Sequence, residues 1–463
     1  MTPIFSPTPA APVMAQRSDA VTAAVSDLHG RTVSWFRLDG GKHRGAIGVA
    51  EGDALERAVR VGIELGVPVV GAVASSGADV SEGVASLHAW GRVARALNDA
   101  SGVVPTLLAV AGPCVSGPAL LLGLVDQVVM TTDAFAYVTG PDTVTEFTGV
   151  PVSRVDLGGP AVHDLRSGVA ALVVDDDSDA LAALAAILEY LPDHHLDDPP
   201  WFADADPVDR ECRLAPSVVP SESNASYDVR DVISDVVDAG SMFELRARHA
   251  PNLVTAFARL GGRSVGVVAN QPSKRAGTLD IEASQKGARF VQWCDAFNVP
   301  LLTFVDTPGY EPGTDLEWRG IVRHGAQLVH AYAAATVPRL CVVLRKAYGG
   351  AYIVMDSKPL GNDWYCAWPG AEIAVMGARG AVQILHGRRL AANADEPARR
   401  AEQIELEREF DDRFLSPLPA AERGYVDEVI APGDTRRALS AVLGRLVTKR
   451  EDHPARRHSN TPL

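Results

Sequence analysis

The chain has 463 residues, of which 47% are hydrophobic and 22% charged, and its formal net charge is −15. This length exceeds what one hydrophobic core supports, so we expect two to four globular domains. The acidic balance argues against a nucleic-acid-binding protein. Five scattered cysteines without a CxxC pair support neither a zinc site nor a disulfide framework, and no apolar run reaches the roughly 20 residues that cross a bilayer, so we expect a cytoplasmic protein.

The first half of the chain alternates strand and helix patterns. Residues 1–30, rich in Pro, Ala and Thr, indicate a disordered tail or one loose helix. A strand begins near Arg31–Leu38, a glycine-rich basic turn follows at Gly40–Gly45, and Asp53–Leu65 has the apolar spacing of a helix. Val67–Ala74 is a continuous apolar run, as expected for a strand that is covered on both faces.

A change of composition then divides the chain. Asp179–Tyr190 predicts an amphipathic helix, and residues 192–226 are rich in Pro and Asp without any period, which indicates a linker. We therefore expect a first domain over residues 31–226, which includes this linker, and a second domain over 227–449. Residues 450–463 form a polar tail. Alternating strands and helices in both halves predict an α/β fold with largely parallel sheets.

Two segments of the chain, 105–140 and 338–377, follow the same pattern. Each begins with Pro, runs through a short apolar stretch, and reaches a turn of small residues. Each then continues through a second apolar stretch and a strand to a closing Gly. The upstream segments 66–83 and 298–316 correspond as well. A repeat of this length indicates two copies of one domain, each with the same kind of site.

The small-residue turns, Ser116-Gly117 and Gly349-Gly350-Ala351, are the candidate functional features. At each turn a strand ends and a helix begins, so backbone N–H groups lack partners within the helix. Glycine also lets a ligand approach the backbone closely. Such a turn can hold a thioester oxygen while it becomes an enolate oxyanion. For one turn alone, simple tight packing is the more common explanation, but its repetition in the second copy favours a function.

From about Leu38 to Val447 the sequence resembles the carboxyltransferase (β) subunit of biotin-dependent acyl-CoA carboxylases of the acetyl-/propionyl-CoA type. The matching motifs are GPCVSGPA at 112–119, VTGPDTV at 138–144, the segment from NQPSKRAGTLDI to TPGYEPGT at 270–314, RGIVRHGAQL at 319–328, RKAYGGAYIVM at 345–355 and AWPGAEIAVMGARGAV at 367–382. The resemblance implies tandem crotonase-like (ClpP/crotonase) domains of the α/β class, each a superhelix of ββα repeats. It also implies a homo-oligomer, typically a ring-shaped hexamer with active sites between subunits.

The same resemblance implies the reaction and its partners. A carboxyl group would move from carboxybiotin, held on a separate biotin carboxyl carrier that works with a biotin carboxylase, to the α-carbon of acetyl-CoA or propionyl-CoA. The first domain would hold acyl-CoA and the second biotin, with no metal and no side-chain base. By motif, the oxyanion-binding N–H pairs fall on Ser116 and Gly117 in the first copy, and on Gly350 and Ala351 in the second.

Further residues are expected to bind the substrates. Gly77, Gly349 and Tyr352 belong to the matching motifs beside the two turns. Ile353 follows GGAY at the position that influences acyl selectivity in the family, where Asp is common in propionyl-type enzymes. An apolar residue there is compatible with acetyl-CoA, and we expect both acyl groups to be accepted. In the basic turn, Lys42 and Arg44 could reach the phosphates of CoA, although a solvated surface turn is equally consistent.

The sequence departs from the family pattern at the first site. Where two glycines are usual, it has Ser116 and Gly117, followed by Pro118, which has no N–H to offer. The segment SSGAD at 75–79 carries Asp79 where the family has Arg. These changes leave two alternatives open beside the carboxylase subunit. One is an acyl-CoA decarboxylase or transcarboxylase, and the other is a non-catalytic scaffold subunit of a carboxylase complex.

Overall fold

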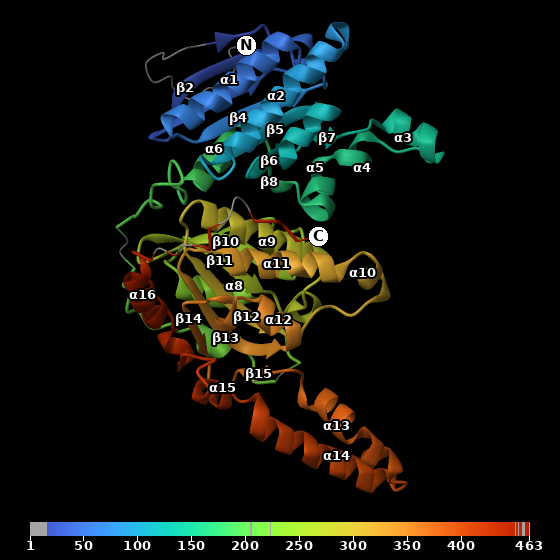
Figure 1. Ribbon diagram of the computed structural model, residues 1–463, viewed down its shortest axis with the longest axis vertical. Helices are drawn as coiled ribbons and strands as arrows, with labels where there is room; N and C mark the ends of the chain where they lie inside the picture. Colours follow the sequence, from blue (N-terminus) through green and yellow to red (C-terminus); the bar gives the residue numbers. More distant parts are fainter. Residues whose placement is uncertain are drawn as a thin grey trace. The chain divides into compact units, whose positions relative to one another are not determined.

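The computed structural model describes residues 16–203, 206–222, 224–449, 451, 453–455 and 459–462. These residues form two compact units, each built on one mixed sheet (Figure 1). The first unit runs to Pro200 and takes in two short later segments, 245–249 and 296–298. The division therefore falls inside the predicted linker, and residues 201–226 are part of the second unit. Of the predicted tails, residues 1–15, 450, 452, 456–458 and 463 lie outside the described residues.

The strands of the first unit are β1 (Gln16–Arg17), β2 (Val21–Leu28), β3 (Arg31–Leu38), β4 (Val69–Ser75), β5 (Thr106–Val115), β6 (Gln127–Thr131), β7 (Phe135–Tyr137) and β8 (Ala170–Val174). Their order in the sheet is β1-β2-β3-β4-β5-β6-β8, and β7 pairs with the C-terminal end of β5. The first three strands are antiparallel and the others parallel. Strand β3 has the predicted bounds, whereas β2 occupies residues that the sequence assigned to a tail.

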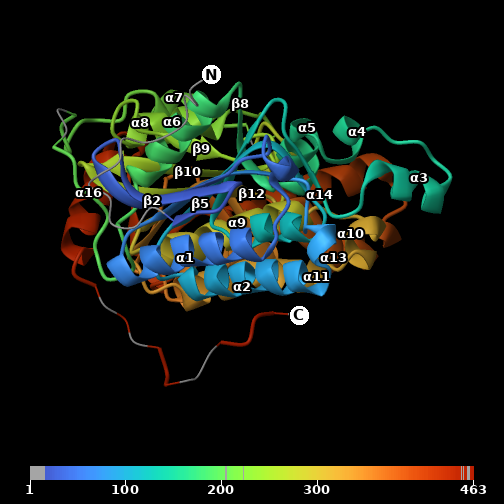
Figure 2. The same cartoon turned by 90° about the horizontal axis from the view of Figure 1, so that it is seen from above.

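The helical elements of the first unit are η1 (His43–Gly45), α1 (Val49–Leu65), η2 (Val80–Glu82), α2 (Val84–Ala100), η3 (Gly117–Gly123), α3 (Pro141–Thr148), α4 (Arg154–Gly158), α5 (Pro160–Val162), η4 (His163–Ser167) and α6 (Asp177–Leu188). Helices α1 and α2 lie side by side (Figure 2) and bury Val59 and Leu97 in one core with Leu108 of β5. Helix α1 begins earlier than predicted, because the Val49 N–H donates to Oε2 of Glu82 at 2.6 Å.

The strands of the second sheet are β9 (Phe243–Leu245), β10 (Leu253–Leu260), β11 (Arg263–Asn270), β12 (Leu301–Thr307), β13 (Arg339–Tyr348), β14 (Trp364–Ala367), β15 (Glu372–Ala374) and β16 (Glu428–Val429). The helical elements of the second unit are α7 (Ala215–Val218), α8 (Val229–Val236), η5 (Arg275–Gly277), α9 (Ile281–Ala296), α10 (Thr314–Trp318), α11 (Ile321–Ala334), α12 (Gly349–Val354), η6 (Lys358–Leu360), α13 (Ala378–Ala392), α14 (Glu396–Phe410), η7 (Asp411–Leu415), α15 (Leu418–Glu422), η8 (Pro432–Asp434) and α16 (Thr435–Leu446). The sheet order is β16-β14-β13-β12-β11-β10-β9, with β15 beside the end of β13. Helices α8 and α16 share one core with β10–β14, through residues such as Ile233 and Leu443.

The second sheet repeats the first strand for strand. Within the described residues, β9–β16 take the places of β1–β8, including the short strand that pairs with the end of the longest one. Both central ladders also shift register at the same place, between Val73 and Ser75 in the first copy and between Val305 and Thr307 in the second. The duplication predicted from the sequence is therefore confirmed in the fold.

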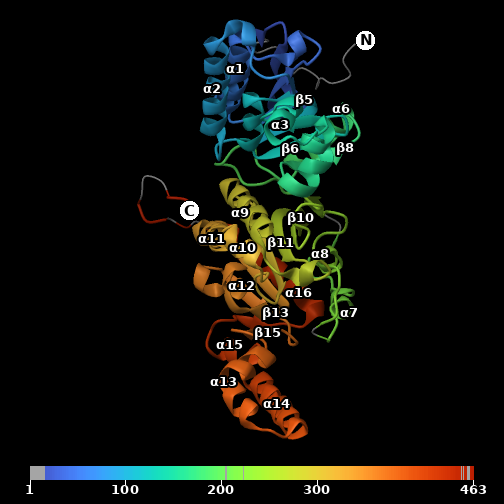
Figure 3. The same ribbon diagram turned by 90° about the vertical axis from the view of Figure 1, so that its right-hand side faces the viewer.

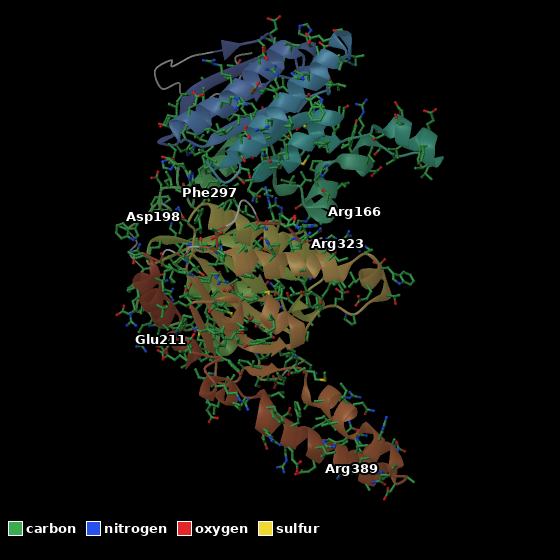
Figure 4. The ribbon with its side chains drawn as sticks, in the orientation of Figure 1. Arg166, Asp198, Glu211, Phe297, Arg323 and Arg389 are labelled. Carbon is green, nitrogen blue, oxygen red and sulfur yellow. The ribbon has the colours of Figure 1, made fainter. Side chains whose placement is uncertain are left out.

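The second unit adds a hairpin of two long helices, α13 and α14, which projects from its sheet (Figure 3). Arg389 of α13, labelled in Figure 4, forms an ion pair with Glu402 of α14 at 2.5 Å. The rings of Phe410 and Phe414 pack at the base of the hairpin with centroids 4.9 Å apart. This hairpin provides one wall of the cavity described below.

Candidate active site

The two small-residue turns occupy the same place in their sheets. Strand β5 ends at Val115, which pairs with Tyr137 of β7, and strand β13 ends at Tyr348, which pairs with Ala374 of β15. Counting onward from these pairs gives three equivalent positions: Ser116 and Gly349, Gly117 and Gly350, and Pro118 and Ala351. The leading residue is left-handed in both turns, with φ of 66° at Ser116 and 58° at Gly349.

In the first turn, one of the two predicted amides has a backbone partner. The Ser116 N–H donates to the carbonyl of Tyr137 at 2.9 Å, so this amide is engaged within the sheet. Gly117 opens the helical turn η3, and its N–H has no carbonyl within that turn to donate to. Pro118 follows and has no N–H. Of the pair predicted for this site, the Gly117 amide is the one that can still serve a ligand.

A further amide, which the sequence reasoning missed, lies after β4. Ile47 and Ala78 form a parallel bridge in which the Ile47 N–H donates to the Gly77 carbonyl at 2.8 Å, and the Asp79 N–H donates to the Ile47 carbonyl at 3.0 Å. The bridge leaves the Ala78 N–H unused, and this amide has no acceptor among the residues that the structure describes.

The second copy builds the same arrangement after β12. The Leu279 N–H donates to the Gly309 carbonyl at 3.1 Å, and the Glu311 N–H donates to the Leu279 carbonyl at 2.9 Å. The Tyr310 N–H is left over in the same way, again with no acceptor in the described part of the chain. The signal was present in the sequence repeat as the two glycines, Gly77 and Gly309, which both have positive φ.

In each copy the two turns are in contact. A Cβ atom on Gly77 would lie 2.9 Å from Cβ of Ser116, and one on Gly350 would lie 3.8 Å from Cε2 of Tyr310. The first copy therefore brings the amide of Ala78 near that of Gly117. The second copy brings the amide of Tyr310 near that of Gly350. Two N–H donors on adjacent turns can share one carbonyl oxygen and stabilise negative charge that develops on it.

The second unit has a cavity of about 820 Å³ beside its small-residue turn. The cavity starts at Gly349 and Gly350 and is bounded by β15, the α13–α14 hairpin and α15. Its lining is apolar apart from a few groups, among them the guanidinium of Arg423 and the hydroxyl of Tyr425. A space of this kind suits a largely apolar ligand with a few polar atoms.

Two of the predicted substrate-binding residues line this cavity. Ile353 is 36% exposed and faces it from α12. Tyr352 is half-buried, meets the Tyr365 ring edge to face at 5.9 Å, and also contributes to the lining. Burial raises the pKa of Tyr352 to about 12, so its hydroxyl stays neutral near pH 7.

The basic turn lies against the first site through its backbone. The Ser76 N–H donates to the Arg44 carbonyl at 2.9 Å, and the Ser75 hydroxyl donates to the Gly45 carbonyl at 2.7 Å. The side chains of Lys42 and Arg44 are exposed. The carboxylate of Asp79 accepts hydrogen bonds from Ser81, which lower its pKa, and caps the turn η2. Asp79 therefore has a local structural role.

A buried ion pair between Arg345 and Asp306 stabilises the strands that lead into the second small-residue turn. Arg345 of β13 donates through Nε to Asp306 at 3.0 Å, and through Nη1 to the carbonyls of Glu222 and Ala225 at 3.0 and 2.8 Å. Burial raises the pKa of Asp306, and the charge of Arg345 opposes that rise. Arg345 thereby fastens the segment before α8 to β13, the strand that leads into the second turn.

Among the described residues, no group of three or more His, Cys, Asp and Glu side chains is placed to hold a metal ion. All five cysteines are buried free thiols, and burial raises the pKa of Cys114 to about 12. No helix in this part of the chain is long and apolar enough to cross a membrane.

Comparison with known proteins agrees with this geometry. Residues 9–461 match the family model of the carboxyl transferase domain. The chain belongs to the carboxyl transferase family. The carboxyltransferase subunit of propionyl-CoA carboxylase from Haloferax mediterranei is 46% identical over 446 residues, which cover 96% of this chain and 86% of that one. The methylmalonyl-CoA decarboxylase subunit alpha of Veillonella parvula is 39% identical, with coverage of 96% and 86%.

A solved structure shares the fold as well as the sequence. The transcarboxylase 12S crystal structure, a hexamer assembly with methylmalonyl-coenzyme A and methylmalonic acid bound, superimposes on this carboxyl transferase with a TM-score of 0.92. The two chains are 41% identical, and the match covers 96% of this chain and 85% of the other. The predicted carboxyltransferase identity and the tandem crotonase-like fold are thereby confirmed.

Proposed function

We propose that this carboxyl transferase is the carboxyltransferase component of an acyl-CoA carboxylase that acts on short acyl-CoA, propionyl-CoA and acetyl-CoA in particular. The observation that carries the proposal is the duplicated arrangement of two amides on adjacent turns. It stands in a chain that is 46% identical to a propionyl-CoA carboxylase subunit. One copy of the arrangement serves the thioester, and the other serves biotin.

The protein acts on the thioester through its backbone. The amides of Ala78 and Gly117 donate to the thioester oxygen, and these bonds strengthen as the α-proton leaves and the oxygen becomes an enolate oxyanion. The enolate carbon then forms its bond to the carbon of the CO2 released from carboxybiotin. The sequence had assigned Ser116 as the partner of Gly117, and the bond from Ser116 to Tyr137 favours Ala78 in its place.

Carboxybiotin, carried by a separate chain, would release CO2 by cleavage of the bond between its ureido nitrogen and its carboxyl carbon, and that nitrogen would then take up the α-proton. The second unit suits biotin, because the apolar cavity of about 820 Å³ has room for the fused rings of biotin and for part of the chain that links them to the carrier. The amide of Gly350 lies at the start of this cavity, and together with the amide of Tyr310 or Ala351 it would receive the ureido oxygen. The residues Lys42 and Arg44 lie beside the first site, where CoA phosphates would need cations.

The partners follow from the reaction. The chain needs a biotin carboxylase and a biotinylated carrier to complete ATP-dependent carboxylation. We propose that copies of it assemble as in transcarboxylase 12S, whose crystal structure is a hexamer, and that each active site is completed between subunits. Purified chain mixed with these partners, ATP and bicarbonate should carboxylate propionyl-CoA or acetyl-CoA. Failure with every acyl-CoA tested would contradict the proposal, and release of CO2 from methylmalonyl-CoA without biotin would favour the decarboxylase alternative.

Ile353 offers a test of acyl selectivity. We expect Ile353→Asp to lower turnover of acetyl-CoA while turnover of propionyl-CoA is retained, with a change of about tenfold or more in the ratio of the two kcat/KM values. Contact with a single methylene group in an apolar site is worth at least that factor. The reconstituted assay with both substrates measures the ratio. An unchanged ratio would remove Ile353 from the set of substrate-binding residues.

A further inference from the structure

The residue that opens the first turn is a serine in a backbone conformation that serine rarely adopts. Ser116 has φ of 66° and ψ of −155°, a region populated almost only by glycine. The equivalent residue of the second copy is Gly349, so a glycine fits this place in the fold. A side chain is held here against a conformational cost, and a cost of this kind at a reacting centre points to a function for the side chain.

The position of the Ser116 hydroxyl suits a donor. Ser116 is exposed, and its hydroxyl has no hydrogen-bond partner among the residues that the structure describes. The Cβ atom of Ser116 lies against Gly77, which directly precedes Ala78. Gly117 directly follows Ser116 in the chain. The hydroxyl therefore stands beside both amides of the first site. The backbone N–H of the same residue cannot take this role, since it donates to Tyr137.

The first turn also has fewer donors than the second. Pro118 removes the amide that Ala351 retains at the equivalent position. The first turn has lost an N–H and gained an O–H relative to its duplicate. Both changes lie within three consecutive residues.

We propose that the Ser116 hydroxyl is a catalytic donor of the first site, which hydrogen-bonds the thioester oxygen as it becomes the enolate oxyanion. The proposal rests on the proposed carboxyl transfer and adds a side chain to a site otherwise built from backbone. The hydroxyl keeps its proton throughout, so it stabilises charge without entering the proton balance of the reaction. It should act mainly on kcat, because its bond to oxygen strengthens as the charge develops.

Two substitutions separate the effect of the Ser116 hydroxyl from the effect of the strained backbone. Ser116→Gly removes both, and Ser116→Ala removes the hydroxyl while a Cβ stays in the left-handed conformation. We expect kcat for carboxyl transfer to fall about tenfold or more in both variants, with KM changed less than threefold. The melting temperature should rise in Ser116→Gly alone. Ser178→Ala, which removes an exposed hydroxyl from α6, is the control and should leave kcat unchanged.

The assay is transfer of a labelled carboxyl group from methylmalonyl-CoA to free biotin by the full-length chain, with thermal unfolding measured in parallel. If Ser116→Gly keeps or raises kcat while its melting temperature increases, Ser116 is only a source of backbone strain that the fold tolerates. The inference is then overturned. A loss of kcat in Ser116→Gly but not in Ser116→Ala also overturns it, because the backbone would then be responsible. If the wild-type chain transfers no carboxyl group at all, the proposed function fails instead.

Discussion

Gly350→Pro should lower kcat for carboxyl transfer by about 10²–10³-fold, because it removes a main-chain N–H that stabilises developing charge on oxygen. Proline is tolerated in the first turn of a helix, and Gly350 lies in the first turn of α12 with a negative φ, so the fold should survive. The experiment measures kcat and the melting temperature of the variant and of the wild type. A large loss of kcat at nearly unchanged melting temperature is the expected result.

Ala351→Pro is the matched control, and it also decides between two candidate partners for Gly350. The first copy carries Pro118 at the equivalent position, so the turn accommodates proline there. If Tyr310 supplies the second amide of this site, Ala351→Pro should cost less than about tenfold in kcat. A loss as large as that of Gly350→Pro would show instead that the Ala351 N–H is the donor, as the sequence pattern predicted.

Arg345→Ala should destabilise the protein by about 3–5 kcal/mol, since it leaves Asp306 buried without its counter-charge. It also releases the carbonyls of Glu222 and Ala225. Chemical denaturation gives the free energy of unfolding for the variant and the wild type. The control is Arg408→Ala, which removes an exposed arginine paired with Glu405 and should leave the free energy of unfolding nearly unchanged. Equal effects in the two variants would show that the Arg345 pair does not stabilise the second turn.

Local patterns predicted much of the fold. Strand β3 has the predicted bounds, because its apolar residues and the turn that follows are readable from neighbouring positions. The repeat predicted the duplication, which both sheets show. The start of α1 was missed because its first N–H groups are capped both by Glu51 and by Glu82, and Glu82 lies far along the chain from Val49. No periodicity within a helix reports a contact of that kind.

The sequence marked the two glycine turns as the candidate site, but it could not indicate which of their amides are engaged within the sheet. The glycine turns marked where the amides gather, and the structure puts the large cavity beside the second of them. The engagement of the Ser116 amide could not be foreseen, because it depends on strand β7 pairing with the end of β5. The role of Ala78, which follows Gly77, could not be foreseen either. It depends on a bridge to Ile47, which lies in a separate turn.

Transfer of a carboxyl group from labelled methylmalonyl-CoA to free biotin by the purified chain tests the central claim most directly, because it needs no other protein. The account predicts labelled carboxybiotin and an equal amount of propionyl-CoA, with both products lost together in Gly350→Pro. Propionyl-CoA formed without labelled biotin, or equal activity in the variant, would contradict a carboxyl transfer that depends on these two turns.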